Sequence, residues 1–263
     1  HPGEWVNRYI SKTRIAGTYK TTKEIIDSFT AGSRGDSSHC IFNTLPLNIA
    51  EKTLPIHPYL IGLWLGDGSR NSSEVTCHVD DYSFYSKYLV KLGFKISDFK
   101  PDKRNITTGR FSIYGILREL KNLNIYKNKH VPAIYLRGSF EQRLELIKGL
   151  MDSDGTVSKE TNSCEFNNGN KLIAESFYEL LMSVGIKANF TQRTSASGNL
   201  DYRIHFTPNI DVFNIPRKVK RLDRNKSQQL KSFHRMISSY EYIEPKPMRC
   251  ITVDSPNSMY LAG

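Results

Sequence analysis

Two acidic residues, Asp67 and Asp154, occupy matching places in two short stretches of similar sequence, 60–68 and 147–155. Two carboxylates that met would repel each other, and one would stay protonated unless a cation lay between them. A hard divalent ion such as Mg²⁺ prefers oxygen ligands and removes this conflict. Two or three such ions beside a phosphodiester could activate water and stabilise the leaving 3′ oxygen. The pair therefore predicts a metal site suited to phosphodiester hydrolysis.

Glycines flank both acids in a way that predicts how they are positioned. Gly62 and Gly149 lie in the middle of the two mostly apolar runs and would let two helices cross with their backbones nearly in contact. Gly68 and Gly155 follow the acids, and we expect each to end its helix with a positive φ. An acid is unfavourable at the negative end of a helix dipole. The recurrence of an acid at this place in both stretches argues against the alternative that the two acids are polar helix-end residues without a function.

The similarity continues beyond these stretches, which indicates a duplicated unit. The two acids are 87 residues apart, whereas Leu92–Lys95 matches Val184–Lys187 at a spacing of 92 and Arg110–Ile113 matches Arg203–Phe206 at 93. Apolar periodicity and turn residues predict an α+β chain. The expected elements of the first unit are a helix at 58–66, strands at 73–79, 95–100 and 106–113, and helices at 80–92 and 114–123. Those of the second are helices at 140–151 and 170–184 and strands at 163–167, 187–194 and 200–207, with a turn at 197–199.

The two ends of the chain differ from the repeat. Thr21 and Glu24 have capping-box spacing and predict a short helix at 21–26. The Gly- and Ser-rich stretch 30–38 is expected to be a loop, 225–238 a final helix, and 241–263 a β-prone tail.

The 263-residue chain carries a formal net charge of +11, with a pI near 9.4. Such an excess favours an anionic polymer as partner, because neutralised phosphates release counterions, although a merely solvated basic surface has the same composition. No apolar run is long enough to span a membrane. The four cysteines are isolated, without zinc-ligand or disulfide spacing, which is typical of reduced thiols in an intracellular protein.

The paired motifs and their spacing resemble the LAGLIDADG homing endonucleases, specifically the single-chain members with two motifs, over about 58–235. The resemblance implies a duplicated αββαββα fold with pseudo-twofold symmetry, in which the motif helices form the central interface and two antiparallel sheets form a saddle in the DNA major groove. It implies a monomer with DNA access that cuts both strands of a long, asymmetric site and leaves 3′ overhangs. Asp67 and Asp154 would be the metal-binding catalytic acids, with Gly66 and Ser153 beside them in the Mg²⁺ site. Leu65 and Gly66 depart from the consensus of the motif.

The family also places a lysine near each metal cluster. Lys129, in the sequence Lys-His-Val-Pro, matches the family's Lys-x-(Ile/Val)-Pro element, and Lys218 holds the matching place in the second half, in preference to Lys220. An ammonium there would offset charge on the phosphorane or orient water. An ordinary phosphate contact remains the alternative for Lys218.

Target recognition is expected from the strands, where alternate side chains share one face. Arginine and glutamine can contact guanine and adenine edges with two hydrogen bonds, whereas others would bind phosphate. A register shift of one residue would invert the set. The candidates are Lys100, Lys103, Arg104 and Arg110 in the first half, and Gln192, Arg193, Asn199, Arg203 and His205 in the second.

The segment 248–263 is similar to a late β segment of intein splicing domains, which implies that the chain is the endonuclease region of an intein. The expected division is an extension or linker at 1–50, a first half at 51–138, a second half at 139–238 and a splicing remnant at 239–263. An RNA maturase could use the same scaffold without the acids, and a DNA-binding regulator usually lacks one acid. Both acids are present here, which favours cleavage.

Overall fold

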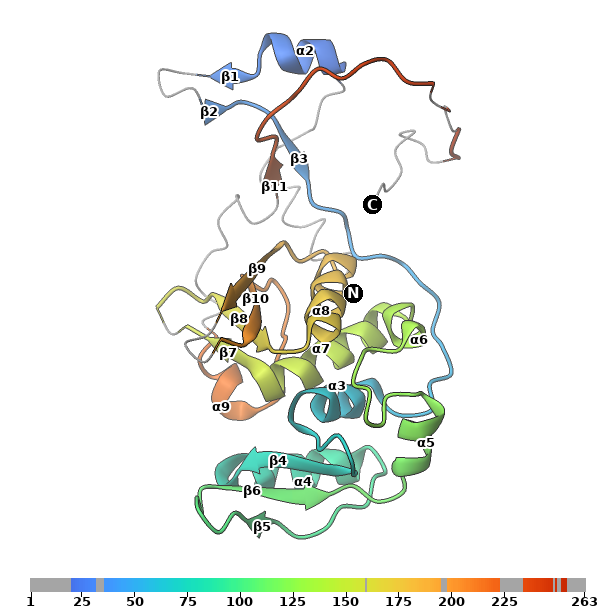
Figure 1. The fold of residues 1–263 in the computed structure, drawn as a ribbon, viewed down its shortest axis with the longest axis vertical. Helices are drawn as coiled ribbons and strands as arrows, with labels where there is room; N and C mark the ends of the chain where they lie inside the picture. The colour runs from blue at the N-terminus through green and yellow to red at the C-terminus, as the bar shows by residue number, and fades with distance from the viewer. Residues whose placement is uncertain are drawn as a thin grey trace. The chain divides into compact units, whose positions relative to one another are not determined.

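The computed structural model describes residues 20–31, 36–158, 160–194, 198–222, 234–247, 249 and 252–254. The chain divides into two compact units: Leu45–Ser232 form one, and His1–Thr44 together with Phe233–Gly263 form the other. The larger unit is an α+β structure with antiparallel sheets, which confirms the expected fold class (Figure 1). Within the described residues no helix is both long and apolar enough to cross a membrane.

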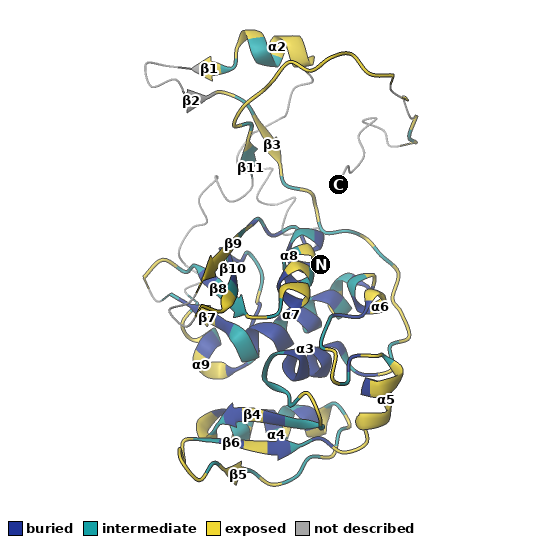
Figure 2. Cartoon of the chain, in the orientation of Figure 1, coloured by how far each residue is buried: buried dark blue, intermediate teal, exposed yellow. Residues whose placement is uncertain are grey.

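Two packed helices, α3 (Pro58–Asp67) and α7 (Phe140–Asp154), form the centre of the larger unit (Figure 1). Pro58 suits the first turn of α3, and Ser139 and Gln142 form a capping box at the start of α7. Figure 2 shows α3 buried over almost its whole length. The helix packs against α7 on one side and against the rest of the first half, including β4, on the other. The predicted helical motif stretches are confirmed.

Gly62 and Gly149 bring the two helix backbones into direct contact. A Cβ added to Gly62 would lie 2.5 Å from the carbonyl oxygen of Leu146, and one added to Gly149 would lie 2.8 Å from the backbone nitrogen of Leu63. Both distances are too short for any side chain. The prediction of a close crossing at these two glycines is confirmed.

The expectation of a positive φ at the glycines that end these helices is wrong. Gly68 has φ −75° and ψ 149°, and Gly155 has φ −91° and ψ 147°, so that each helix passes straight into extended backbone. Glycine is needed there for space instead. A Cβ on Gly68 would lie 2.5 Å from the indole Cδ1 of Trp64, and one on Gly155 would lie 2.5 Å from the carbonyl oxygen of Met151.

The first half continues from α3 into a three-stranded antiparallel sheet of order β4-β6-β5. Its elements are β4 (Glu74–His78), α4 (Val79–Lys91), β5 (Lys100–Pro101), β6 (Thr108–Ser112) and α5 (Leu117–Asn122). Tyr85 and Leu89 of α4 are buried in the core of the first half. Isolated bridges join Gly68 to Val75 and Ile96 to Ile113.

The second half follows the same plan with a fuller sheet of order β7-β8-β10-β9. After α6 (Ala133–Leu136), the last helix of the first half, its elements are α7, β7 (Gly155–Val157), β8 (Cys164–Asn168), α8 (Lys171–Ser183), β9 (Ala188–Thr194), β10 (Leu200–Phe206) and α9 (Pro216–Val219). Gly155 pairs with Phe166 as Gly68 pairs with Val75. The same connection from motif helix to sheet therefore occurs twice, which confirms the predicted structural repeat.

The elements predicted for both halves are present, with ends that differ by up to three residues, except that the strand expected at 95–100 is reduced to the bridge at Ile96 and the short β5. Residue 197 of the expected turn at 197–199 lies outside the described residues.

The smaller unit contains α2 (Thr22–Asp27), β1 (Thr30–Ala31), β2 (Asp36–Ser37), β3 (Cys40–Phe42) and β11 (His234–Met236). The Thr21–Glu24 capping box of α2 is confirmed. The loop expected at 30–38 is wrong at its ends, because β1 pairs with β2. The helix expected at 225–238 is wrong at 234–236, where β11 pairs with β3; residues 223–233 lie outside the described residues.

The tail expected to be β-prone forms no strand in 237–247, and most of 248–263 lies outside the described residues.

Candidate active site

Asp67 and Asp154 are the last residues of α3 and α7, and the helix crossing places them together. A Cβ added to Gly66 would lie 3.2 Å from Oδ2 of Asp154 and 2.5 Å from Cβ of Ser153. The carboxylate of one half therefore lies against the backbone of the other. The close approach that the sequence predicts for the two acids depends on glycine at position 66.

The environment of the two acids disfavours their charged forms. Burial, followed by the nearby charge of Asp154, raises the pKa of Asp67 to about 7, against the opposing effects of Lys218 and Lys129. Burial also raises the pKa of Asp154, but the side chain of Asn168 donates a hydrogen bond of 2.7 Å to Oδ2 and works in the opposite direction. Two partly buried, adjacent carboxylates of this kind attract a cation.

Lys129 binds the end of the first motif helix. Its Nζ donates hydrogen bonds to the carbonyl oxygens of Leu65 (3.0 Å), Gly66 (3.3 Å) and Gly68 (2.6 Å). The ammonium also lies 5.0 Å from the ring centroid of Trp64. A cation is favourable at the negative end of a helix dipole, so Lys129 offsets the electrostatic cost of the acid there.

Lys218 does the same for the second motif helix. Its Nζ donates to the carbonyl oxygens of Met151 (2.8 Å), Asp152 (2.7 Å) and Ser153 (3.4 Å), and the residue is 5% exposed. Lys220, the alternative at sequence level, is exposed at the end of α9. Of these two lysines, the structure brings Lys218 to the acids.

Burial lowers the pKa of both lysines to about 8, against the raising effects of nearby acids. For Lys129 the strongest of these acids is Asp154, the acid of the other half. Both ammonium groups remain largely charged at neutral pH. The charge of each lysine lowers the pKa of both acids, and the two ammonium groups could stabilise negative charge that develops between these acids.

The oxygens at this centre fit a hard divalent cation. No group of three or more His, Cys, Asp or Glu side chains suited to a metal occurs in the part of the chain that the structure describes. A cation here would therefore be held by the carboxylates of Asp67 and Asp154 with carbonyl oxygens such as those of Gly66 and Ser153, together with water or phosphate. Because these two carbonyls accept the longest bonds from the lysines, a bound cation would compete only with the weakest ones.

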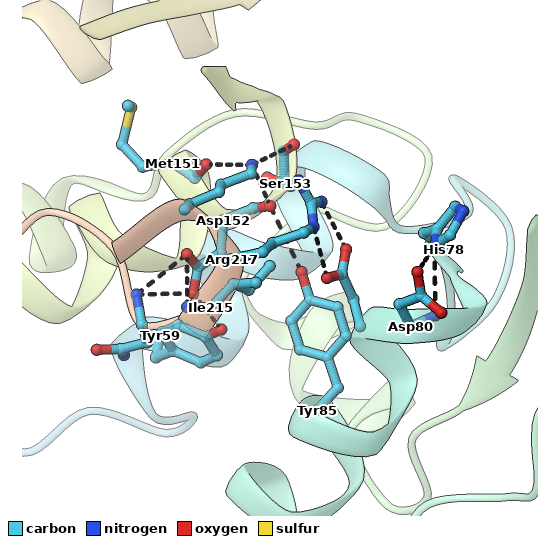
Figure 3. A network of polar contacts seen from close by, with 12 residues as sticks. Tyr59, His78, Asp80, Tyr85, Met151, Asp152, Ser153, Ile215 and Arg217 are labelled. Atoms are coloured by element: carbon cyan, nitrogen blue, oxygen red, sulfur yellow. Dashed lines mark hydrogen bonds and ion pairs between the residues drawn. The ribbon is translucent and has the colours of Figure 1, made fainter. Parts of the chain in front are cut away.

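Asp152, which takes the place of Leu65 in the second motif, lies in a network of hydrogen bonds next to this site (Figure 3). It is 2% exposed and accepts hydrogen bonds from the hydroxyl of Tyr59 (2.6 Å) and the backbone N–H groups of Asn214 and Ile215 (3.1 Å and 3.2 Å to Oδ1). Burial raises its pKa to about 6 against these bonds. Asp152 thus fixes the segment that leads into Lys218.

The sequence did not identify four further polar residues that contact the acids or the segments carrying the lysines: Asp152, Asp81, Asn168 and Asn170. For Asp152 a signal was present, since it is an acid at a place where the other motif has leucine. Asp81, Asn168 and Asn170 lie at or near the starts of α4 and α8, and only the packing of the two halves shows what they contact.

The predicted DNA-binding residues of the first half lie on and beyond the sheet, apart from the acids. Arg110 of β6 pairs with Thr76 of β4 and with Lys100 of β5, and all three are exposed on the face opposite the core. Arg110 also lies 3.7 Å from Glu74 in a half-exposed ion pair. Lys103 and Arg104 are exposed in the loop between β5 and β6.

In the second half, Arg203 and His205 of β10 share the outer face with Glu165, which lies 3.7 Å and 3.3 Å from them. Arg193 pairs with Asp201 and also belongs to this face. Gln192 pairs with the buried Tyr202, so its side chain starts from the opposite face of the sheet. Asn199 is exposed just before β10. The structure therefore groups Arg193, Arg203 and His205 and separates Gln192 from them.

Comparisons with known proteins find a family match in the second half of the larger unit. Residues 141–238 match the family model described as a LAGLIDADG-like domain. The chain is 27% identical over 264 residues to the replicative DNA helicase DnaB of Mycobacterium intracellulare, covering 98% of this chain and 42% of that protein. The chain thus spans less than half the length of this relative.

Solved structures with partial similarity include a mesophilic variant of the homing endonuclease I-DmoI (17% identity, TM-score 0.42, 62% of this chain and 95% of that chain). The N-terminal LAGLIDADG domain of DUF199/WhiA is similar at 10% identity and a TM-score of 0.38, over 68% of this chain and 88% of that chain. Residues 141–238 are therefore similar to a LAGLIDADG-like domain, and the motif helix within them, α7, has a counterpart in α3 of the first half.

Proposed function

We propose that the chain is a site-specific DNA endonuclease that makes double-strand breaks in a long, asymmetric target by Mg²⁺-dependent phosphodiester hydrolysis. The observation that carries the proposal is the pair of partly buried acids, Asp67 and Asp154, each ending a motif helix whose terminal carbonyls bind a lysine. When bound, the divalent ions would activate water and stabilise the leaving oxygen.

The protein's own groups have separate tasks in this proposal. Asp67 and Asp154 bind the cations, with the carbonyls of Gly66 and Ser153 beside them. Lys129 and Lys218 stabilise charge that develops on the phosphate. The outer faces of the two sheets bind the duplex through Lys100, Lys103, Arg104 and Arg110 in the first half and Arg193, Asn199, Arg203 and His205 in the second. Gln192, whose side chain starts from the opposite face, would contact the duplex only at the edge of the sheet formed by β9.

We also propose that the chain is the endonuclease region of an intein and acts as a monomer inside the cell. Its smaller unit is assembled from both ends of the chain, so that the larger unit is an insertion within it. The pairing of β3 with β11 joins the two segments where the insertion begins and ends. The alignment with less than half of a replicative helicase agrees with a segment carried inside a longer protein.

The test uses a supercoiled plasmid carrying a DnaB-type helicase gene in which the flanks are joined across the region that corresponds to this chain. We expect Mg²⁺ to support nicking and then linearisation, and a chelator to stop both. Asp67→Asn and Asp154→Asn should each lower the rate of linearisation by about 10³-fold or more, because each removes a metal ligand. Their affinity for DNA should change little.

Asp80→Asn is the matched control, since the side chain of Asp80 is 78% exposed and lies 3.4 Å from His78, away from the lysines and the paired acids in the contacts of the described residues. Full cutting by both Asp67→Asn and Asp154→Asn would reject the assigned roles. A DNA-binding regulator is the second candidate, because the basic outer faces bind DNA without any need for the acids. Tight, salt-sensitive binding to a duplex selected from a random library, with no cutting in Mg²⁺ or Mn²⁺, would favour it.

A further inference from the structure

Each active-site lysine is held in place by a helix of the opposite half. Asn170, the N-cap of α8, donates a hydrogen bond of 2.7 Å from Nδ2 to the backbone carbonyl of Lys129. Asp81, in the first turn of α4, accepts two hydrogen bonds from Arg217, the neighbour of Lys218. Since α4 and α8 are equivalent elements of the repeat, the two contacts are reciprocal.

The contact between Asp81 and Arg217 is the stronger of the two. Nε and Nη2 of Arg217 lie 2.7 Å and 2.6 Å from the two carboxylate oxygens of Asp81, in the planar double contact that arginine forms with carboxylates. Asp81 is 5% exposed, so the pair is shielded from water on the acid's side. Figure 3 shows Arg217 reaching from the segment near Asp152 toward the helix that carries Asp80.

The short helix α9, Pro216–Val219, gives this pair its effect on the site. Arg217 and Lys218 are consecutive in one turn of helix, and they are anchored in different directions: Arg217 to α4 of the first half, Lys218 to the end of α7 in the second. A single turn has little rigidity of its own. Without the contact between Arg217 and Asp81, Lys218 would be held only by its hydrogen bonds to the end of α7. An unpaired guanidinium would then lie next to it in the chain.

We propose that Asp81 is a positioning residue that acts through Arg217 to hold Lys218 in its catalytic place, so that each half completes the active site of the other. This inference rests on the proposed endonuclease function. It implies that the two strands of a target respond differently: Asp81→Asn affects the strand served by Lys218, and Asn170→Ala affects the strand served by Lys129.

The test measures cleavage of each strand separately. A duplex obtained by binding selection carries a different label at each 5′ end and is cut in Mg²⁺ under single-turnover conditions. We expect Asp81→Asn to slow one strand by about 10-fold or more, since small displacements of a catalytic group cost this much, and to leave the other strand within about 2-fold. Asn170→Ala should slow the opposite strand. Asp81→Glu should restore part of the rate, and Asp80→Asn should match the wild type.

A double-variant cycle separates positioning from other roles of Asp81. If Asp81 acts through Arg217, Asp81→Asn combined with Arg217→Gln should be no slower than the worse single variant. Multiplicative losses would mean that Asp81 acts on the metal or the substrate directly and would overturn the inference. Equal slowing of both strands by Asp81→Asn would indicate a general structural role and would also overturn it. A wild-type chain that cuts neither strand would refute the endonuclease proposal itself, and this inference with it.

Discussion

The two active-site halves share one backbone plan but hold their charges differently. In the second half, Asp154 accepts a hydrogen bond from Asn168, and Asp152 beneath it accepts three from Tyr59, Asn214 and Ile215. In the first half, Leu65 replaces Asp152 in the apolar core, and no hydrogen bond to the Asp67 side chain is present among the described residues.

This difference shows which parts of a duplicated site are fixed by geometry. Gly62 and Gly149 are both required by the helix crossing, and a lysine binds each helix end. The hydrogen bonds around the acids are not constrained in this way and have diverged. The consequence is that the two halves are electrostatically unequal even though their backbones match.

The largest effect is expected when the second half is made to resemble the first. Asp152→Leu should lower the free energy of unfolding by about 3 kcal/mol, because the buried hydroxyl of Tyr59 and the N–H groups of Asn214 and Ile215 lose their acceptor. Chemical denaturation at pH 7 measures it. Leu65→Met, a volume-conserving change at the equivalent place, should cost less than about 1.5 kcal/mol. Similar losses in the two variants would show that the Asp152 network adds nothing specific.

A smaller, pH-dependent effect should distinguish Asp67. Burial and Asp154 raise its pKa from 3.8 to about 7, so the folded protein binds more protons than the unfolded chain between these values. The free energy of unfolding should therefore fall as pH rises from 4 to 7 in the absence of divalent ions, by on the order of 2 kcal/mol relative to Asp67→Asn. Denaturation of both proteins at several pH values checks this.

Mg²⁺ should reverse this loss at pH 7.5 in the wild type but not in Asp67→Asn, because a ligand that binds only the folded state stabilises it. If the difference between the two proteins is flat with pH, the carboxylate of Asp67 is not buried against Asp154.

The sequence was sufficient to predict the elements that local signals specify. The repeated motif, the helix periodicity and the capping residues Thr21 and Glu24 led to the correct elements, and the central glycines led to the close crossing. What it could not supply depends on contacts between segments that are distant in the chain. Asp81 meets Arg217 across 136 positions, and nothing near either residue signals the other.

The backbone conformation at the two glycines after the acids was also harder to predict than the need for glycine there. Glycine after each acid suggested a left-handed helix end, yet Gly68 and Gly155 are extended and are needed because their own helices leave no room for a Cβ. The outward or inward direction of Gln192 likewise required the strand register, which no local pattern determines.

The smallest effect concerns the one hydrogen bond that separates Asp154 from Asp67. Asn168→Ala removes the Nδ2 donor to Asp154 and also the Oδ1 acceptor of the Asn170 N–H. The second loss does not depend on pH, whereas the first matters only while Asp154 is charged, because the donor lowers its pKa. The free energy of unfolding should therefore fall by about 1 kcal/mol more at a pH where Asp154 is charged than at a pH low enough to protonate it.

Asn167→Ala is the matched control, since Asn167 is the preceding residue of β8 and its side chain starts from the opposite face of the sheet. It should cost the same at both pH values. If Asn168→Ala also behaves in this way, the hydrogen bond from Asn168 does not set the charge of Asp154, and the inequality of the two halves would have to come from burial alone. If the pH dependence appears, one asparagine accounts for much of the difference between two acids that the fold otherwise treats alike.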